Sequence, residues 1–504
     1  MKTNQSILRL SPLALACLVG CGIVSAAEVD SQLTARNGDV DALLVFTRSA
    51  HALTPLAAAA DYKLRRRALV GALRTQADAT QRDTRAWLDA RGIAYRSYWI
   101  SNVIEVRLAQ SALAELARRD DIVRIEANDS FAAGLPKPEQ ARAPDDVESV
   151  AWGVTKIDAP DVWAAGFTGQ GVVIGGQDTG YQWDHPALQT HYRGWDGSTA
   201  DHNYNWHDSI HDSGGNPCGN DSPEPCDDYG HGTHTAGTFA GDDGATHQIG
   251  VAPGAKWIGC RNMDNGNGTP ATYIECMQWL LAPTDLSDAN PNPDLAPDIV
   301  SNSWGCPASE GCTAGDEVIE AVSNLVAGGI FFAASAGNGG SSCSTISTPP
   351  AIYDASFVVG ATDSNDRMAG FSSRGPVSGS SLIRPDLSAP GVSVPSAWND
   401  GAYATISGTS MAAPHVAGTA ALLMSINPDL KGHPDEVAAI LRASTVTDGV
   451  TDPSNDGCGG LTIADWPNYQ VGYGRLDAYA AAVLAGLEAP DDVVFTDGFD
   501  GAAP

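Results

Sequence analysis

Positive charge is scarce in this sequence. Its 504 residues contain 29 Lys and Arg against 60 Asp and Glu, which gives a formal net charge of −31 at pH 7. Proteins that bind nucleic acids need a basic face that neutralises phosphates, so the composition argues against a nucleic acid as partner. Long apolar runs are also missing beyond the N-terminus, where no segment reaches the roughly 20 residues of a membrane helix. We therefore expect no transmembrane helix.

The first 26 residues are typical of a targeting segment. Lys2 and Arg9 supply positive charge, residues 13–24 are apolar, and Val24-Ser25-Ala26 offers a small-residue cleavage site. This pattern predicts a signal peptide over residues 1–26 and a secreted protein. An alternative lies in Leu18-Val19-Gly20-Cys21, which resembles the lipobox of bacterial lipoproteins. If that site is used, Cys21 carries lipid and the protein is anchored in the cell envelope.

Motifs of zinc proteins are absent. The sequence has no Cys-x-x-Cys pair, which disfavours a zinc site, and no His-Glu-x-x-His motif, which disfavours a metallopeptidase. Eight of the ten cysteines follow the signal segment, and an even number in an exported chain favours disulfides. The short spacings predict Cys218–Cys226 and Cys306–Cys312. Four cysteines remain, and they can pair in three ways: Cys260, Cys276, Cys343 and Cys458.

Charge divides the chain into two parts. Residues 28–135 hold 15 Lys and Arg and 14 Asp and Glu, whereas residues 136–504 hold 12 and 46. The contrast indicates either two units with different fates or acidity that keeps a secreted protein soluble. Residues 36–130 predict a small α+β unit in the order β-α-β-β-α-β, which matches the ferredoxin-like pattern. Its strands are expected at 41–46, 95–100, 103–108 and 121–126, and its helices at 62–89 and 111–118.

Residues 151–486 alternate short apolar strands with helices. The alternation predicts an α/β domain whose mostly parallel central sheet is covered by helices on both faces. Residues 131–150 are rich in Ala, Pro and charge and predict an exposed linker, a typical place for cleavage. Residues 487–504 form an acidic tail, which is either a disordered end or a sorting tag. The strands are expected at 172–176, 256–259, 298–302, 330–334 and 357–360, and helices at 269–281 and 315–327.

Three separate motifs predict nucleophilic catalysis. Small residues precede Ser410 and a helical apolar pattern follows it, which predicts that this serine lies at a helix N-terminus, where negative charge is stabilised. Asp178 follows an apolar strand, at the end where open α/β sheets place their sites. His231 lies between two glycines at the start of a predicted helix. A hydroxyl becomes nucleophilic when a base takes its proton and a third group orients that base, and these three residues supply those roles.

Two further motifs flank this triad. Asn338 ends the stretch 333–338 after an apolar strand, where its side-chain N–H can stabilise an oxyanion beside the backbone N–H of Ser410. The segment Asn302-Ser303-Trp304-Gly305 lies at the end of another strand, and exposed backbone there can pair with an extended substrate.

These five motifs resemble those of the subtilisin-like serine proteases, or subtilases. Within that family the segments Cys260-Arg-Asn-Met263, Asn302-Ser-Trp-Gly305 and Phe371-Ser-Ser-Arg-Gly-Pro376 resemble bacterial bacillopeptidase F-like enzymes. The resemblance covers roughly residues 151–485 and implies a subtilisin-like three-layer domain. It also implies a serine endopeptidase that hydrolyses peptide bonds in proteins through an acyl-enzyme, with Asp178, His231 and Ser410 as its triad.

The resemblance extends to residues 36–130, which are similar to the subtilase propeptide. It implies that this unit assists folding, inhibits the active site and is removed by self-processing within residues 131–150. It further implies a substrate pocket with two walls, in which the bulk of Trp304 narrows or flattens the cleft. One wall is Ser303, Trp304 and Gly305, and the other is Ala334, Ser335 and Gly337.

The expected enzyme needs no cofactor for catalysis, acts on proteins and peptides, and is a monomer. Members of the family often bind structural calcium, but no EF-hand-like loop is present, so calcium stays possible with no residues assigned. The insertion at 195–228 contains His207 and His211, which are spaced i, i+4 and bind a metal if helical; the alternative is a solvated loop.

Three other histidines, His185, His234 and His415, are interpreted as structural. A rival hypothesis, a non-catalytic subtilase-like binding protein, requires a degenerate triad. All four catalytic positions are filled in this chain.

Overall fold

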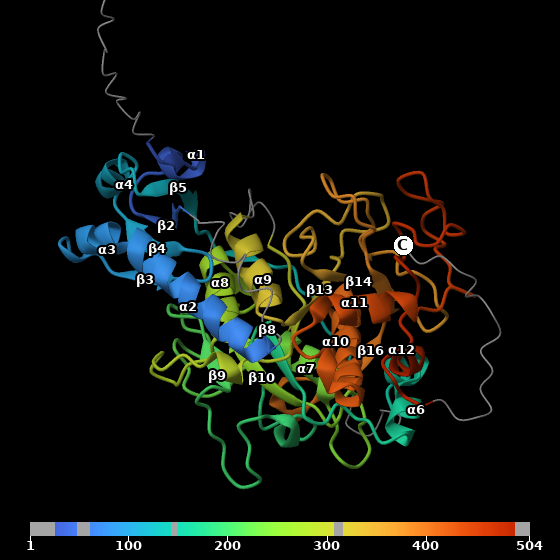
Figure 1. The fold of residues 1–504 in the computed structure, drawn as a ribbon. Coiled ribbons are helices and arrows are strands. Elements are labelled where there is room, and N and C mark those ends of the chain that lie inside the picture. Colours follow the sequence, from blue (N-terminus) through green and yellow to red (C-terminus); the bar gives the residue numbers. More distant parts are fainter. Residues whose placement is uncertain (1–25, 48–60, 143–149, 307–315, 489–504) are drawn as a thin grey trace, which may run out of the picture.

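The computed structural model describes residues 26–47, 61–142, 150–306 and 316–488. Figure 1 shows a smaller unit, coloured blue to cyan, which lies against a larger unit coloured green to red. The smaller unit comprises residues 26–47 and 61–130, and the larger unit comprises residues 150–306 and 316–488.

A five-stranded sheet forms the centre of the smaller unit. Its strand order is β1-β5-β2-β4-β3, with β1 parallel to β5 and the other pairs antiparallel. The elements from β2 to β5 follow the predicted β-α-β-β-α-β order, although the sheet also includes β1, which precedes residue 36. The strands are β1 (Glu28–Val29), β2 (Val40–Phe46), β3 (Tyr95–Tyr98), β4 (Val103–Leu108) and β5 (Ile122–Ala127). The helices are α1 (Ser31–Ala35), α2 (Tyr62–Thr80), α3 (Arg82–Asp89) and α4 (Gln110–Leu116).

The single helix predicted over residues 62–89 is broken at Gln81. This side chain is buried, donates to the Asn102 side chain at 3.0 Å and accepts a hydrogen bond from Ser97. The contact ties the break to the β3–β4 turn, and the continuous helical pattern of the sequence gives no sign of it. Helix α2 extends over the larger unit (Figure 1), where Nε of the buried Arg66 donates to the carbonyl of Gly328 at 2.8 Å.

A parallel sheet of seven strands organises the larger unit. All of its neighbouring strands pair in parallel, in the order β15-β14-β13-β12-β8-β10-β9. Each predicted strand of this part is present. The bounds are β8 (Val173–Asp178), β9 (Trp206–Asp208), β10 (Lys256–Arg261), β12 (Ile299–Asn302), β13 (Phe331–Ser335), β14 (Phe357–Thr362) and β15 (Leu387–Pro390).

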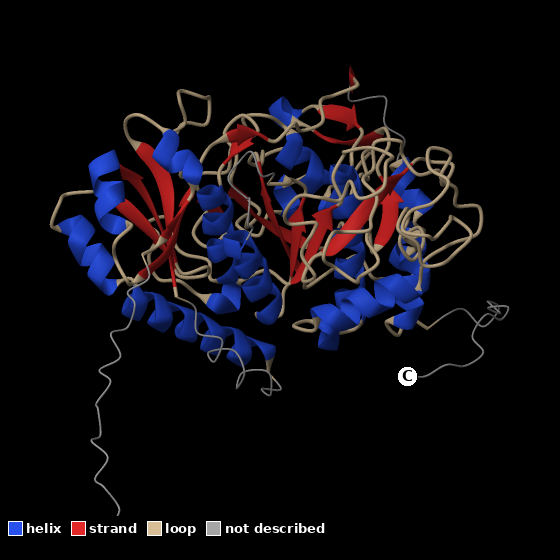
Figure 2. Ribbon diagram, turned by 90° about the horizontal axis from the view of Figure 1, so that it is seen from above, coloured by secondary structure: helices blue, strands red, loops and turns tan. Residues whose placement is uncertain are grey.

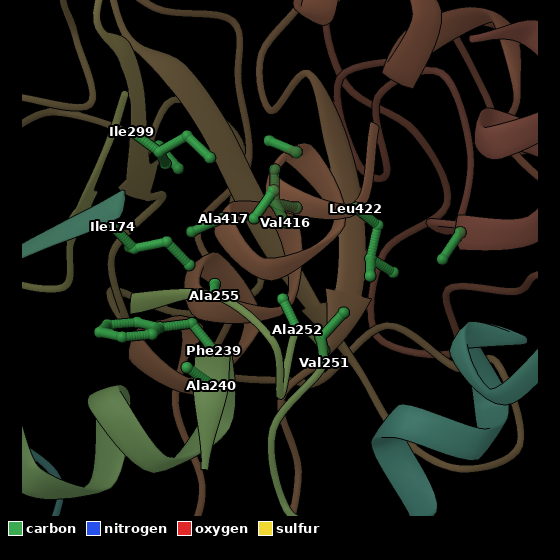
Figure 3. Packing of buried hydrophobic residues seen from close by; sticks show 14 of the residues in the cluster. Ile174, Phe239, Ala240, Val251, Ala252, Ala255, Ile299, Val416, Ala417 and Leu422 are labelled. Carbon is green, nitrogen blue, oxygen red and sulfur yellow. The ribbon is translucent and has the colours of Figure 1, made fainter. Parts of the chain in front are cut away.

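Helices cover both faces of this sheet, as Figure 2 shows. Successive side chains of a strand point to opposite faces. Phe331 therefore packs in the core beneath α7 (His231–Ala240) and α10 (Thr409–Ile426), whereas Phe332 packs in the core beneath α8 (Pro270–Leu281) and α9 (Asp316–Ala327). Figure 3 shows part of the first core, where Val416 and Ala417 of α10 lie near Ile174 of β8. This burial forces α10 through the middle of the domain and fixes where its first turn lies.

The helices of the larger unit are α5 (Trp152–Lys156), α6 (Ala159–Ala164), α7 (His231–Ala240), α8 (Pro270–Leu281), α9 (Asp316–Ala327), α10 (Thr409–Ile426), α11 (Pro434–Ala443) and α12 (Ala478–Leu484). Short 3₁₀ turns occur at η4 (Gln189–His191), η5 (Pro293–Leu295), η7 (Asn399–Gly401) and η8 (Pro428–Leu430). No helix within the described ranges combines the length and apolarity needed to cross a membrane.

The segment predicted as an exposed linker pairs with the larger unit at two places. Strand β6 (Phe131–Ala132) runs antiparallel to β11 (Asn267–Gly268). Strand β7 (Gln140–Arg142) runs antiparallel to β17 (Tyr403–Ile406), which itself pairs with β16 (Val394–Ala397). The linker thus pairs with distant strand edges, which its composition does not reveal, while Ala132, Gly134, Lys137, Pro138 and Glu139 are exposed. Residues 143–149 lie outside the described part.

Three disulfides join pairs of described residues in the larger unit. The predicted pair Cys218–Cys226 is confirmed. The structure selects Cys260–Cys276 and Cys343–Cys458 from the three pairings left open by the sequence. Cys306 is disulfide-bonded, whereas Cys312 of the predicted Cys306–Cys312 pair lies outside the described residues.

Candidate active site

Asp178 and His231 meet inside the larger unit. Asp178 is the last residue of β8 and His231 is the first residue of α7. Nδ1 of His231 donates to Oδ1 of Asp178 at 2.7 Å, and both side chains are almost completely buried. The backbone N–H of Thr179 donates to the same carboxylate oxygen at 2.8 Å. This arrangement fixes the imidazole orientation and leaves its Nε2 to act as a base.

Glycine is required where the two elements touch. A Cβ atom on Gly232 would lie 2.1 Å from the carbonyl oxygen of Gly180 and 3.0 Å from Cβ of Asp178. No side chain fits in that space, so only glycine after His231 allows α7 to start this close to the end of β8.

Asp227 and Thr179 join the end of β8 to the start of α7. Neither residue was predicted from the sequence. Oδ1 of Asp227 accepts hydrogen bonds from Thr179 Oγ1 at 2.8 Å and from Gly230 N at 2.8 Å. Its Oδ2 accepts from the backbone N–H and the hydroxyl of Thr233 at 2.9 and 2.6 Å. Thr179 Oγ1 in turn accepts from Gly232 N at 3.0 Å. An acidic residue shortly before the helical histidine was the available signal, because carboxylates often cap helix N-termini.

Ser410 is the second residue of α10, as its sequence pattern predicts. Its hydroxyl donates to the carbonyl of Ser303 at 2.9 Å, and the hydroxyl of Ser303 donates back to the carbonyl of Ser410 at 2.9 Å. Among the described residues, none hydrogen-bonds the buried Nε2 of His231. His231 lies on α7 and Ser410 lies on α10, and these two helices pack against each other. The Nε2 atom without a hydrogen bond is therefore on the helix next to the one that carries Ser410.

Asn338 is exposed just beyond β13. Its Oδ1 accepts hydrogen bonds from the backbone N–H and the hydroxyl of Thr409, both at 2.9 Å. The amide Nδ2 therefore points the other way, and it lies 3.5 Å from the Cβ position that a side chain on Gly408 would take. A donor beside the first turn of α10 is placed as an oxyanion-stabilising group requires.

The six residues expected to line the pocket lie in or just after two neighbouring parallel strands, β12 and β13. Ser303 is buried and bonded to Ser410, and Gly305 is partly exposed. Trp304 is 2% exposed, its ring stacks on Tyr273 with centroids 3.8 Å apart, and its Nε1 donates to the carbonyl of Gln177 at 3.0 Å. Its ring therefore packs within the core cluster beneath α8 and α9.

The second predicted wall lies at the end of β13. Ala334 and Ser335 are buried in β13. Gly337 has a φ of 97°, in the left-handed region that favours glycine, and its N–H donates to Oγ1 of Thr409 at 3.2 Å. Both expected walls thus begin next to the first turn of α10.

The histidines interpreted as structural make backbone contacts. Nε2 of His234 lies 3.0 Å from the Val394 carbonyl, and Nδ1 of His415 lies 2.7 Å from the Met411 carbonyl. Burial lowers the pKa of His234 to about 3 and that of His415 to about 4. Nε2 of His185 lies 2.8 Å from the Ala402 carbonyl. These side chains fill the interior around α7 and α10 as neutral rings.

The helical spacing suggested for His207 and His211 is wrong, because His207 lies in strand β9 and His211 follows it in a loop. Both rings nevertheless converge on Glu275 of α8. No group of three or more His, Cys, Asp or Glu side chains in the described ranges is arranged to hold a metal ion.

The segment after β6 passes over the site. Ala133 N donates to the Gly266 carbonyl at 2.9 Å, and Tyr229 donates its hydroxyl to the Leu135 carbonyl at 3.2 Å. Cγ of Pro136 lies 2.9 Å from the Cβ position of Gly408, two residues before Ser410. Residues 133–136 therefore run between the His231 and Ser410 elements.

Comparison with known proteins adds the family. A family model described as the subtilase family matches residues 169–461. The chain belongs to the subtilase family. Subtilases are serine-type endopeptidases, so the predicted enzyme class agrees with this membership. The seven-stranded parallel sheet between helices agrees with the predicted three-layer α/β fold.

Individual subtilases match most of this chain. Bacillopeptidase F from Bacillus subtilis (strain 168) is 36% identical over 475 residues, covering 89% of this chain and 31% of that protein. Subtilisin E from the same strain is 32% identical over 339 residues, covering 67% of this chain and 74% of that protein. Serine protease AprX, also from that strain, is 35% identical over 320 residues. The chain thus spans less than a third of the length of bacillopeptidase F and most of the length of subtilisin E.

Proposed function

We propose that this chain is the precursor of a secreted serine endopeptidase that hydrolyses peptide bonds in proteins through Asp178, His231 and Ser410. The observation that carries the proposal is the buried 2.7 Å hydrogen bond between Asp178 and His231. It supports a base with a defined tautomer at the start of a helix that packs on the serine helix. Family membership supplies the reaction class.

The proposed reaction starts with a rotation of the Ser410 side chain. Its hydroxyl leaves the Ser303 carbonyl and donates to Nε2 of His231, which takes the proton as Oγ attacks the scissile carbonyl. Asp178 stabilises the resulting imidazolium. The amide of Asn338 and the backbone N–H of Ser410 stabilise the oxyanion. His231 then protonates the leaving amine, and water releases the acyl-enzyme with the same base.

The smaller unit acts in this proposal as an inhibitory propeptide that the enzyme removes itself. The path of residues 131–142 supports this role, because strands β6 and β7 pair with β11 and β17 of the larger unit. Such pairing is how a protease holds an extended substrate. We propose that the attacked bond lies within residues 133–136, and the contacts of Ala133 and Pro136 support this position.

Residues 1–26 act as the export signal in this proposal, and the mature enzyme works as a monomer on protein and peptide substrates. Residues 1–25 lie outside the described part of the structure. Catalysis by the three side chains needs no cofactor, and structural calcium remains a possibility with no residues assigned.

Replacement of the nucleophile tests the proposal. Ser410→Ala should lower turnover by about 10⁶-fold and leave the precursor uncut. Ser425→Ala, on the same helix but bonded only to the Leu422 carbonyl, serves as the matched control and should be processed normally. N-terminal sequencing of the secreted protein then locates the cut. Normal processing of purified Ser410→Ala, or inhibition by a chelator instead of a serine-directed phosphonylating agent, contradicts the proposal.

A further inference from the structure

A cluster of ionisable side chains lies between the smaller and larger units, away from the catalytic residues. Its centre is Glu275 of α8, which is 8% exposed. Nε2 of His207 lies 2.9 Å from its Oε1, and Nε2 of His211 lies 3.0 and 3.1 Å from its two oxygens. Both histidines come from the insertion at residues 195–228. The ring of His207 also stacks on Trp279, with centroids 5.8 Å apart and planes 13° from parallel.

The smaller unit completes this cluster with Tyr98, the last residue of β3. The buried tyrosine hydroxyl lies 2.7 Å from Oε2 of Glu275 and 2.8 Å from Oε2 of Glu105 on β4. Adjacent backbone groups dock as well, because Trp99 N and Ile100 N both donate to Oε1 of Gln278, at 2.7 and 3.3 Å. The β3–β4 turn therefore contacts α8 directly beside Glu275.

The contact between Tyr98 and the two glutamates offers one proton for two carboxyl groups. Tyr98 has one hydroxyl proton, yet two carboxyl groups lie within hydrogen-bond distance of its oxygen. Two ionised carboxylates there would leave one facing an oxygen lone pair in a buried place, which is costly. The cost disappears if Glu105 is protonated, and the charge of Glu275 is compensated if the two imidazoles are protonated.

The wider charge distribution favours those protons. Asp221 lies 2.5 Å from Nδ1 of His211, and Asp288 lies 3.3 Å from Nδ1 of His207. The cluster borders a cavity of about 350 Å³ that Arg74 and Arg96 of the smaller unit also line. The charged groups that face the imidazoles are thus Arg74, Arg96 and Glu105 from the smaller unit and Asp221, Glu275 and Asp288 from the larger one.

The pKa shifts agree with this picture. Burial disfavours the imidazolium of His207, but Asp288 and Glu275 outweigh burial and raise its pKa to about 9. The pKa of His211 is raised in the same way, against burial, by Glu275 and Asp221. Burial would raise the pKa of Glu275, but the two histidines lower it well below its ordinary value. Burial raises the pKa of Glu105.

We infer that protonated His207 and His211, together with Glu275, form a docking site for Tyr98 of the smaller unit, and that loss of the Glu105 proton loosens this contact as the pH rises. The inference rests on the proposed role of the smaller unit as an inhibitory propeptide. It assigns to the 195–228 insertion a part in retaining that unit.

The direction of the pH dependence follows from proton linkage. A histidine or carboxyl group whose pKa is raised in the docked state contributes its full stabilisation below its ordinary pKa and loses it as the pH rises through the raised value. The carboxylates that raise the pKa values of His207 and His211 belong to the larger unit and stay beside the rings after undocking. Glu105 belongs to the smaller unit, and its pKa is raised by burial in the docked state and returns to its ordinary value in water. The contact should therefore weaken as the pH rises through the raised pKa of Glu105.

A second contact between the units acts in the same direction. Arg124 of β5 donates to Glu126 at 2.7 Å and also to Glu317 of the larger unit. Burial, followed by the hydrogen bond and charge of Glu317, raises the pKa of Glu126. The experiment must therefore separate the two titrations, and Glu126→Gln removes the second one while Arg124 still contacts Glu317.

The experiment uses the full-length Ser410→Ala, Glu126→Gln chain, so that it does not depend on hydrolysis. Hydrogen exchange of the Trp99 and Ile100 amides, corrected for intrinsic rates, reports opening of the contact at pH 6, 7.5 and 9. We expect protection to fall on the order of tenfold or more from pH 6 to pH 9. Adding His207→Gln and His211→Gln should lower protection at every pH, because the buried charge of Glu275 is then uncompensated.

His202→Gln is the matched control, because His202 belongs to the same insertion but contacts Tyr192 within the larger unit. It should keep the parent profile. If the double histidine variant does not fold, Glu105→Gln replaces it, and this permanently uncharged side chain should keep the amides protected at pH 9. Unchanged profiles in the histidine or Glu105 variants overturn the inference. A change in protection on adding Zn²⁺ or a chelator also overturns it, because the cluster would then hold a metal in place of protons.

Discussion

Thr409 determines which way the amide of Asn338 faces. Its backbone N–H and its hydroxyl both donate to Oδ1 of Asn338 at 2.9 Å, which leaves Nδ2 near Gly408, the residue before α10. The residue immediately before the nucleophile thus aims the side chain that is proposed to stabilise the oxyanion. A fixed donor of this kind stabilises developing charge without reorganising during the reaction.

Removing that donor should slow the chemical step. Asn338→Ala should lower kcat by about 10²–10³-fold with little change in KM, because the amide contacts the oxyanion rather than the ground state. Thr409→Val keeps the backbone hydrogen bond but loses the hydroxyl, so we expect a smaller fall. Steady-state kinetics on a peptide substrate measures both. An Asn338→Ala enzyme with unchanged kcat would exclude this residue from the oxyanion site.

The hydrogen bond between Asp178 and His231 predicts a strong effect of a minimal change. Asp178→Asn keeps the size of the side chain, but its amide can donate to Nδ1 and hold the ring in the wrong tautomer. Turnover should fall by about 10⁴-fold. Asp184→Asn, at an exposed position six residues on, should leave turnover unchanged. A loss of less than tenfold at Asp178 would show that another group orients the base.

Buried neutral histidines predict acid sensitivity of the larger unit. The pKa of His415 is lowered by burial to about 4, whereas an unfolded histidine titrates near 6.5. Its contribution to stability is therefore present above about pH 6.5 and is lost as the pH falls, by about 3 kcal/mol at pH 4. His415→Asn should flatten the fall in urea-unfolding free energy between pH 6.5 and 4 in a Ser410→Ala background. The partly exposed His433→Asn control should retain the fall, and identical slopes for the two variants would contradict the prediction.

The disulfides should differ in their contribution to stability because they close loops of different length. Cys343–Cys458 joins residues 115 apart, whereas Cys218–Cys226 joins residues 8 apart. The loop-entropy model gives losses of about 5 and about 2.5 kcal/mol on removal. Double alanine variants of each pair, in the Ser410→Ala chain, can be compared by urea unfolding. Equal losses, or a larger loss for the short loop, would mean that local strain outweighs chain entropy.

Much of the candidate site is visible in local sequence patterns. Strand ends and helix starts depend on nearby residues, so the apolar run before Asp178 and the glycines around His231 already predict where those side chains stand. The same holds for Ser410 at the start of α10. The resemblance of these motifs to one family then supplied their common role, and the family match confirms that membership.

Contacts between distant segments were not predictable in the same way. The break at Gln81 depends on Asn102 and Ser97, and the pairing of residues 131–142 depends on edges more than a hundred residues away. The i, i+4 spacing of His207 and His211 suggested a helix, yet both rings meet Glu275 from a strand and a loop.

The sequence by itself determined the family, the alternation of strands and helices, and the chemical identity of the residues at each strand end and helix start. Only the tertiary structure decided which of them touch: the Asp178–His231 bond, the aim of Asn338, two disulfide pairings and the charge cluster around Glu275. The physical reason is range. Periodicity and capping act over a few residues of chain, whereas a hydrogen bond or disulfide between distant segments depends on how whole sheets and helices pack.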